Sequence, residues 1–99
     1  MEMDGKLERD IQEKIIKQLE GLPGVECFKI MKANKVNIPD LFFTSVKTGP
    51  WLVELKKDNE EPRSGQYKII EKLNKCGMQA CWVAGWSGWI SFVKKIFLL

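Results

Sequence analysis

The sequence predicts an α/β fold with the order helix, three strands, helix and strand, in which helices flank a mixed sheet. Apolar residues recur at helical spacing in two segments, 6–20 and 65–76. Short runs rich in β-branched and aromatic residues indicate strands at 25–31, 38–43, 51–56 and 79–84. A chain of 99 residues is expected to form one domain, spanning 1–99.

The predicted helices carry signals at their ends. The apolar face of the first helix consists of Leu7, Ile11, Ile15 and Leu19. Gly21 follows its last turn, while Ser64 is expected to cap the start of the second helix and Gly77 its end. Residues 85–89, with the sequence GWSGW, are expected to form a turn. The apolar tail 90–99 favours a last helix over an edge strand.

The connections between the predicted strands determine the kind of sheet. Short turns join the first three strands, so these strands should form an antiparallel meander. The helix between the third and fourth strands allows a crossover that brings the last strand in parallel. We therefore expect a mixed sheet with helices packed on it.

The composition excludes several kinds of chemistry. The chain has no histidine, which removes most serine and cysteine triads and histidine-ligated metals. Its three cysteines contain no C-x-x-C pair, so a structural zinc site is not expected, and each cysteine is expected to be a small buried side chain. Catalysis would have to rest on carboxylates, lysines and a metal that prefers oxygen ligands.

Charge and hydropathy indicate the protein's surroundings. The net charge of +3 and the pI of about 8.8 are compatible with a nucleic-acid partner. No apolar run is long enough to span a bilayer, and the charged N-terminus lacks the apolar core of a signal peptide. We therefore expect no membrane association and a cytoplasmic location, in a bacterium or a phage-infected host.

The run 51–57, WLVELKK, places opposite charges on one face of a predicted strand. Side chains alternate along a strand, so Glu54 and Lys56 share a face opposite to Val53 and Leu55. Asp40 lies at the start of the neighbouring strand, where it can converge with Glu54. Two close carboxylates repel each other unless a cation lies between them, and Mg²⁺ is a cation that takes carboxylate oxygens. Lys56 would then lie beside the metal, able to stabilise phosphate charge.

The first helix adds a further carboxylate. Glu8 falls inside the apolar arc of the helix, whereas Asp10 and Glu13 fall outside it. A carboxylate on a core-facing stripe is costly unless it is paired or bound to metal. Glu8 is therefore expected to reach the same metal directly or through water. Gln12, one turn later, falls at the edge of the arc.

These motifs together resemble the PD-(D/E)xK nuclease superfamily, and within it the small stand-alone phage members of the VRR-NUC branch. Pro39-Asp40 is similar to the PD motif, and Glu54-Leu55-Lys56 to the ExK motif. Glu8, Gln66 and Gly77 match the branch's helix-borne glutamate, its glutamine at the start of the next helix, and its glycine before the last strand. The likeness covers about residues 7–86 and implies a restriction-endonuclease-like αβββαβ core.

The resemblance also implies a function, a Mg²⁺- or Mn²⁺-dependent DNA endonuclease. Asp40, Glu54 and the Leu55 carbonyl would bind the metal, Lys56 would be the catalytic lysine, and Gln66 would orient the lysine or the phosphate. Glu8 would be a further acidic contributor to the metal and to catalysis. Stand-alone relatives form homodimers, and two active sites suit branched DNA such as a Holliday junction.

Two features depart from the branch. The loop 57–65, KDNEEPRSG, is more acidic than a DNA-facing loop should be. The arginine motif behind the branch's name is not evident either, since Arg63 is the only arginine in this region.

Simpler interpretations of the site residues stay open at this point. Glu54 and Lys56 could form a solvated ion pair, and Asp40 could be a turn residue. Glu8 and Gln66 could be ordinary polar residues of a first helical turn. The corresponding alternatives for the whole chain are a catalytically silent nucleic-acid-binding module with the nuclease fold, and a structural protein that binds a partner through its apolar tail.

Two further groups of residues also have alternative roles. Lys68, Lys72 and Lys75 recur at helical spacing and form either a solvated face or a ridge that contacts phosphates. Trp82, Trp86 and Trp89 are expected in the core or at a subunit interface, with base stacking as the alternative. The apolar tail itself suggests a dimer interface.

Overall fold

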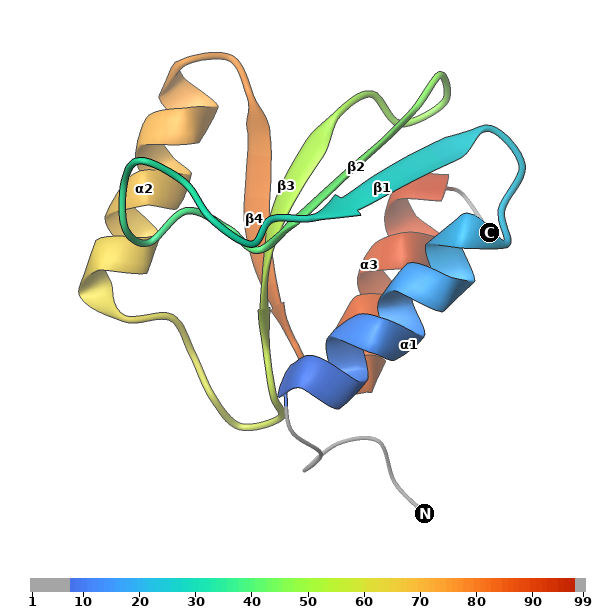
Figure 1. Ribbon diagram of the computed structural model, residues 1–99, viewed down its shortest axis with the longest axis horizontal. Helices are drawn as coiled ribbons and strands as arrows, with labels where there is room; N and C mark the ends of the chain where they lie inside the picture. The colour runs from blue at the N-terminus through green and yellow to red at the C-terminus, as the bar shows by residue number, and fades with distance from the viewer. Residues whose placement is uncertain (1–7, 98–99) are drawn as a thin grey trace.

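Four strands form one mixed sheet in the order β1-β2-β3-β4 in the computed structural model, which describes residues 8–97, with Glu8 described only as backbone (Figure 1). The strands are β1 Val25–Lys29, β2 Leu41–Ser45, β3 Trp51–Lys56 and β4 Gln79–Ala84. β1 pairs antiparallel with β2, β2 antiparallel with β3, and β3 parallel with β4. The predicted α/β fold, its meander and its mixed sheet are confirmed.

Three helices cover the sheet, α1 Glu8–Glu20, α2 Ser64–Lys75 and α3 Gly85–Phe97. In Figure 1, α1 and α3 lie together on one side of the sheet, and α2 lies on the other side near β4. α2 forms the crossover that makes β3 and β4 parallel. Within residues 8–97, no helix has the length and apolar character needed to cross a membrane.

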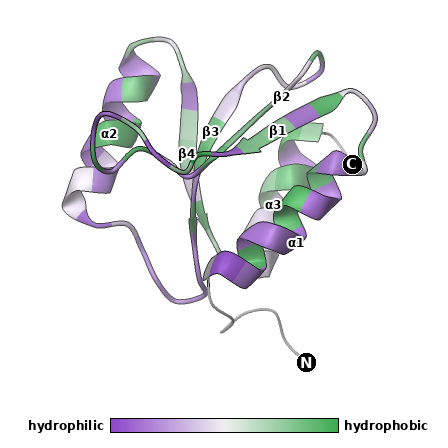
Figure 2. Ribbon diagram, in the orientation of Figure 1, coloured by the Kyte–Doolittle hydropathy of each residue, from purple (hydrophilic) through white to green (hydrophobic). Residues whose placement is uncertain are grey.

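The core lies between the sheet and the pair α1 and α3. Figure 2 shows apolar and polar residues alternating along α1, as expected for a helix with one buried face. The buried core residues are Ile11, Ile15, Leu19, Leu41, Phe43, Val53, Leu55, Trp89, Val93 and Phe97. Each such side chain contributes about 1.5–3 kcal/mol through burial. Val53 and Leu55 thereby fix β3, so that Glu54 and Lys56 must point to the opposite face.

The segment 85–89 is the start of a helix, and its prediction as a turn is wrong. α3 begins at Gly85, and Trp89 and Val93 lie four residues apart on its buried face. Gly85 has a φ of 71°, a conformation that favours glycine, so only Gly88 carries the helix-interior cost of about 1 kcal/mol relative to alanine. Burial of Trp89 and the residues that follow it offsets that cost. The predicted terminal helix is confirmed.

The burial of α3 also removes one argument for a dimer. The apolar character of the tail suggested an exposed interface, but Trp89, Val93 and Phe97 are buried in the chain's own core. The tail is apolar because it covers the sheet face beside α1. A homodimer therefore has to be supported by something other than an exposed tail.

Several element ends differ from the predicted ones by one to three residues. β1 ends at Lys29, and β2 begins at Leu41, after Pro39 and Asp40. The N-cap of α2 is Arg63, one residue before the predicted Ser64. Gly77 has a φ of 95° just after the helix, a conformation that favours glycine, so the predicted C-cap role is confirmed.

Candidate active site

Asp40, the residue before β2, is level with Glu54 on the neighbouring strand β3. Leu41 pairs with Val53, so the residue before Leu41 is level with the residue after Val53. The Leu55 N–H donates a hydrogen bond to Asp40 Oδ1 at 3.0 Å. The hydrogen bond from Leu55 thus links β3 to the Asp40 carboxylate just before the start of β2.

The other oxygen of Asp40 is held by helix α1. Gln12 Nε2 donates to Asp40 Oδ2 at 2.8 Å, and Gln12 is only 9% exposed. Sequence reasoning placed Gln12 at the edge of the apolar arc but did not assign it to the site. The available signal was a buried amide on a core-facing helix, because such a group needs a hydrogen-bond partner.

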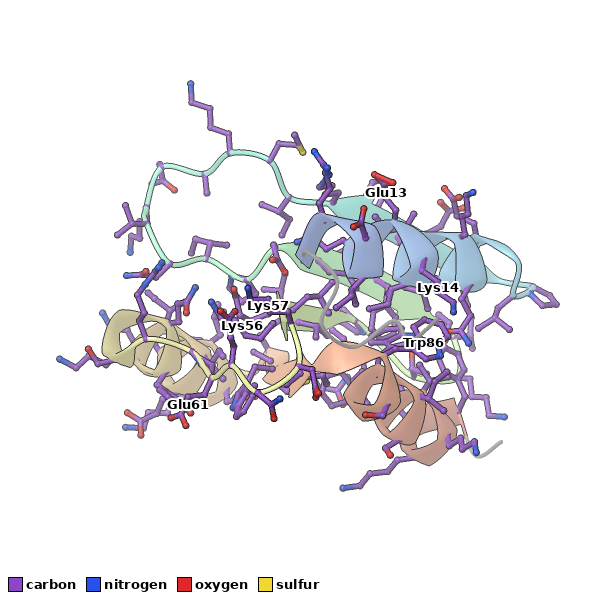
Figure 3. The ribbon with its side chains drawn as sticks, turned by 90° about the horizontal axis from the view of Figure 1, so that it is seen from below. Glu13, Lys14, Lys56, Lys57, Glu61 and Trp86 are labelled. Atoms are coloured by element: carbon purple, nitrogen blue, oxygen red, sulfur yellow. The ribbon has the colours of Figure 1, made fainter. Side chains whose placement is uncertain are left out.

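Glu54 is a buried carboxylate with two neighbours of complementary charge or polarity. It is 5% exposed, and its Oε2 accepts a hydrogen bond from Gln66 Nε2 at 3.1 Å. Lys56 Nζ lies 3.7 Å from the same oxygen, and Lys56 is 8% exposed. Figure 3 shows Lys56 close to α2. The solvated ion pair considered above is therefore wrong, because both charges are buried.

Gln66 joins the first turn of α2 to the site. Its Oε1 accepts the N–H of Arg63 at 2.9 Å, while its Nε2 donates to Glu54. Because both the oxygen and the nitrogen of the Gln66 amide form hydrogen bonds, the orientation of the side chain is fixed. Gln66 is thus both a capping residue of the helix and a partner of Glu54, whereas its predicted role of orienting the lysine or the phosphate stays a prediction.

The donor set suits a hard divalent cation. The carboxylates of Asp40 and Glu54 supply oxygen ligands of the kind that such a cation prefers. Mg²⁺ is typically bound through one or two carboxylates and keeps several waters. The Leu55 backbone adjoins Asp40 through its N–H, and the role of the Leu55 carbonyl as a further ligand stays a prediction. The predicted contribution of the Glu8 side chain lies outside the described residues.

Two carboxylates of the acidic loop 57–63 have partners in or close to the loop. Lys57 Nζ lies 3.8 Å from Glu60 Oε2, and the Tyr67 hydroxyl donates to Glu61 Oε1 at 3.3 Å. In the part of the chain that the structure describes, no three acidic, histidine or cysteine side chains gather in one group. The loop carboxylates therefore do not join Asp40 and Glu54 as a third ligand.

The three cysteines are free, and Cys81 on β4 pairs with Val53, the residue before Glu54. Burial raises the pKa of the Cys81 thiol to about 12. Burial, followed by the carboxylates of Glu20 and Glu26, raises the pKa of Cys27. Both thiols therefore stay protonated at neutral pH, as expected for inert side chains. Cys76, by contrast, is exposed, so its prediction as a buried side chain is wrong.

The tryptophans of the last strand and helix contact other parts of this chain. Trp82 packs edge-on against Tyr67. Lys14 Nζ lies 4.2 Å from the ring centroid of Trp86, and both residues are labelled in Figure 3. Trp89 is fully buried, and its Nε1 donates to Gln18 Oε1 at 2.6 Å. These contacts favour packing roles over base stacking.

Two solved structures share this arrangement of strands and helices. One, a "VRR_NUC domain", has a TM-score of 0.75 and 24% sequence identity, and the match covers 89% of this chain and 94% of that chain. This chain has the VRR_NUC fold. The other, a "VRR_NUC domain protein", has a TM-score of 0.76 and 20% identity over 97% of this chain and 92% of that chain. The VRR_NUC fold thus accounts for nearly the whole sequence.

Sequence comparison alone finds no such likeness. No family model matches the chain, and no curated protein matches it.

Proposed function

We propose that this VRR_NUC-fold chain is a PD-(D/E)xK nuclease that hydrolyses DNA phosphodiester bonds with Mg²⁺ or Mn²⁺. One observation carries the proposal: Asp40 is level with Glu54 in the pairing of β2 with β3, each carboxylate accepts a hydrogen bond from a glutamine of a different helix, and Lys56 is buried beside Glu54. A fold by itself does not determine function, so the proposal rests on these side chains.

The free-energy cost of burying charged side chains at this site argues for a chemical role. Removing two charges from water costs several kcal/mol per ion, and apolar residues of similar volume often stabilise a protein equally well. Glu54 and Lys56 are nevertheless both buried. Charged groups held in this way are typical of functional sites, where they bind ligands or take part in reactions.

Each side chain has a distinct role in the proposed reaction. Asp40, Glu54 and the Leu55 carbonyl would hold the cation, with Glu8 as a further acidic contributor. When bound, a divalent cation lowers the pKa of coordinated water and offsets charge on the phosphate. Lys56 places a positive charge where the phosphate gains negative charge. Gln66 keeps Glu54 in position, and Gln12 does the same for Asp40.

Branched DNA and a homodimer form the finer part of the proposal. A two-fold dimer presents two active sites, and a four-way junction offers two symmetric strands to cut. The apolar tail does not support a dimer, because it is part of the core. The support that remains is the resemblance to stand-alone VRR-NUC proteins.

The function is tested with labelled linear, flapped and four-way DNA, each incubated with Mg²⁺, Mn²⁺ or EDTA. We expect cleavage that requires metal, disappears with EDTA, and is fastest on the four-way junction. Asp40→Ala and Glu54→Ala should abolish it, and activity that survives either change contradicts the assignment of the site. If no DNA or RNA is cut but DNA is bound, the chain is a silent binding module.

A further inference from the structure

A basic cleft runs along α2 on the side away from the protein core. It lies between the segment 35–37 and the helix, and its volume is about 810 Å³. The segment before β2 passes across α2 in Figure 1, and Figure 3 shows the same segment beside α2 from below. The charged side chains that line the cleft are Lys35, Lys68, Glu71, Lys72 and Lys75.

The charge of this cleft is strongly unbalanced. Four ammonium groups face one carboxylate, and that carboxylate is engaged, since Glu71 Oε1 lies 3.8 Å from Lys75 Nζ. Within the described residues, Lys35, Lys68 and Lys72 form no ion pair. Three positive charges therefore line one cleft without compensation, which is the condition for binding a polyanion.

The spacing of the lysines suits successive phosphates of one DNA strand. Lys68, Lys72 and Lys75 recur every three to four residues and so form a stripe along α2. Seven residues of helix rise about 10 Å. One strand of B-DNA carries a phosphate about every 3.4 Å along the axis, so the stripe extends over about three phosphates. Ile69 lies between the lysines in the cleft and offers an apolar surface for the sugars.

The first turn of α2 lies between the stripe and the proposed active site. Gln66, in the first turn of α2, donates to Glu54, and Lys68 follows two residues later. Residues two apart lie on different sides of a helix, but Gly65 lines the cleft and adjoins Gln66, so a strand that leaves the site reaches the cleft by passing around the first turn of α2. Regular spacing and continuity with the site favour nucleic acid over an acidic peptide as the occupant.

We propose that the cleft between residues 35–37 and α2 binds the sugar–phosphate backbone of the cleaved DNA strand beyond the scissile phosphate. The proposal rests on the proposed function, because it assigns the cleft to the same substrate. In this account Lys35, Lys68 and Lys72 contact phosphates and set affinity without reading the base sequence.

Binding of fluorescent four-way DNA in EDTA, measured by anisotropy over a range of salt concentrations, tests the cleft. The groove variant combines Lys35→Gln, Lys68→Gln and Lys72→Gln. The control variant combines Lys47→Gln, Lys94→Gln and Lys95→Gln, which removes the same charge from exposed positions elsewhere. Melting curves confirm that both variants fold.

We expect the groove variant to bind at least about tenfold more weakly at 0.1 M salt. The slope of log K against log salt concentration should become shallower by about three, roughly one for each phosphate that the variant no longer neutralises. In cleavage assays its KM should rise, while the control variant matches the wild type. Equal affinities for the two variants overturn the proposal.

The test separates this proposal from the proposed function. If wild-type protein cleaves DNA and both variants bind it equally, the cleft assignment is wrong and the nuclease assignment stands. If DNA binds through the cleft but no metal supports cleavage, the nuclease assignment is wrong and the cleft assignment stands. If the wild type binds no DNA, both are wrong.

Discussion

Gln66 donates a hydrogen bond to Glu54 and accepts one from the backbone of Arg63, so one amide holds both a site carboxylate and the start of α2. The proposed metal ligand on β3 and the lysine stripe on α2 are thereby fixed relative to each other. Since both Gln66 and Glu54 are buried, replacing either has consequences that solvent cannot relieve.

Gln66→Glu is expected to destabilise the protein in a pH-dependent way. The new side chain keeps an acceptor for Arg63 but replaces the donor to Glu54 with a second negative charge. Repulsion between the two carboxylates raises their pKa in the folded state, so the destabilisation is present at high pH and is relieved as protonation proceeds at lower pH.

Melting temperatures at pH 5 and pH 8 test this expectation. The loss of folding stability in Gln66→Glu should be larger at pH 8 than at pH 5, by about 1 kcal/mol or more, since one pKa unit corresponds to about 1.4 kcal/mol. Gln66→Ala is the control, because it removes the same hydrogen bonds without adding charge. An equal loss at both pH values for Gln66→Glu would show that the two carboxylates do not interact.

Gln12→Ala should impair cleavage more than it impairs stability. It removes the donor to Asp40 Oδ2, and the loss of such a partner behind a metal ligand typically costs about 10–100-fold in metal affinity or activity. Rates measured against Mn²⁺ concentration should show a higher metal requirement. Gln18→Ala is a matched control on the same helix.

Gln18→Ala should show the opposite pattern. It leaves the buried Trp89 Nε1 without its partner and so costs about 1–3 kcal/mol of stability. The folded protein should cleave at the wild-type rate. Similar losses of activity in both variants, per folded molecule, would remove Gln12 from the site.

Mn²⁺ should raise the melting temperature of the wild type. A ligand that binds only the native state stabilises it, by about 2.7 kcal/mol at one hundred times its dissociation constant. Asp40→Asn and Glu54→Gln should lose most of this shift. Glu60→Gln, which alters an exposed loop carboxylate paired with Lys57, should keep it. A full shift in Asp40→Asn would place the cation elsewhere.

Thiol labelling should distinguish the three cysteines. Cys76 is exposed, whereas burial raises the pKa of Cys81 to about 12. At pH 8 only about one Cys81 thiol in ten thousand would be ionised, and the thiolate is the reactive form. Mass spectrometry after brief iodoacetamide treatment should find label on Cys76 and none on Cys81. Rapid labelling of Cys81 would show that β4 opens readily.

The sequence predicted the strands that carry the site more accurately than it predicted α3. β3 and β4 match the predicted 51–56 and 79–84 because short apolar runs with turn residues at both ends leave little freedom in their limits. α3 was misjudged at its start because Gly85 and Gly88 are strong turn signals. Only the packing of Trp89 against the sheet shows that a helix tolerates them.

The sequence also indicated the main charged residues of the site but not their supports. Period-two alternation placed Glu54 and Lys56 on one face, and the pairing of β2 with β3 brings Asp40 level with Glu54. Gln12 could not be assigned in this way because its contact with Asp40 joins residues 28 positions apart. The tail was ambiguous because an apolar helix can cover its own sheet or a second chain.

Cleavage by Lys56→Ala and Lys57→Ala, compared with the wild type, tests the central claim most directly. The two lysines are adjacent, but Lys56 is buried beside Glu54, and Lys57 pairs with Glu60 in the loop. Lys56→Gln, which fills more of the same space, guards against a loss caused by unfolding. We predict that both Lys56 variants lose metal-dependent cleavage at least about 100-fold while remaining folded, and that Lys57→Ala cleaves nearly as well as the wild type. Wild-type cleavage by a folded Lys56 variant would contradict the account.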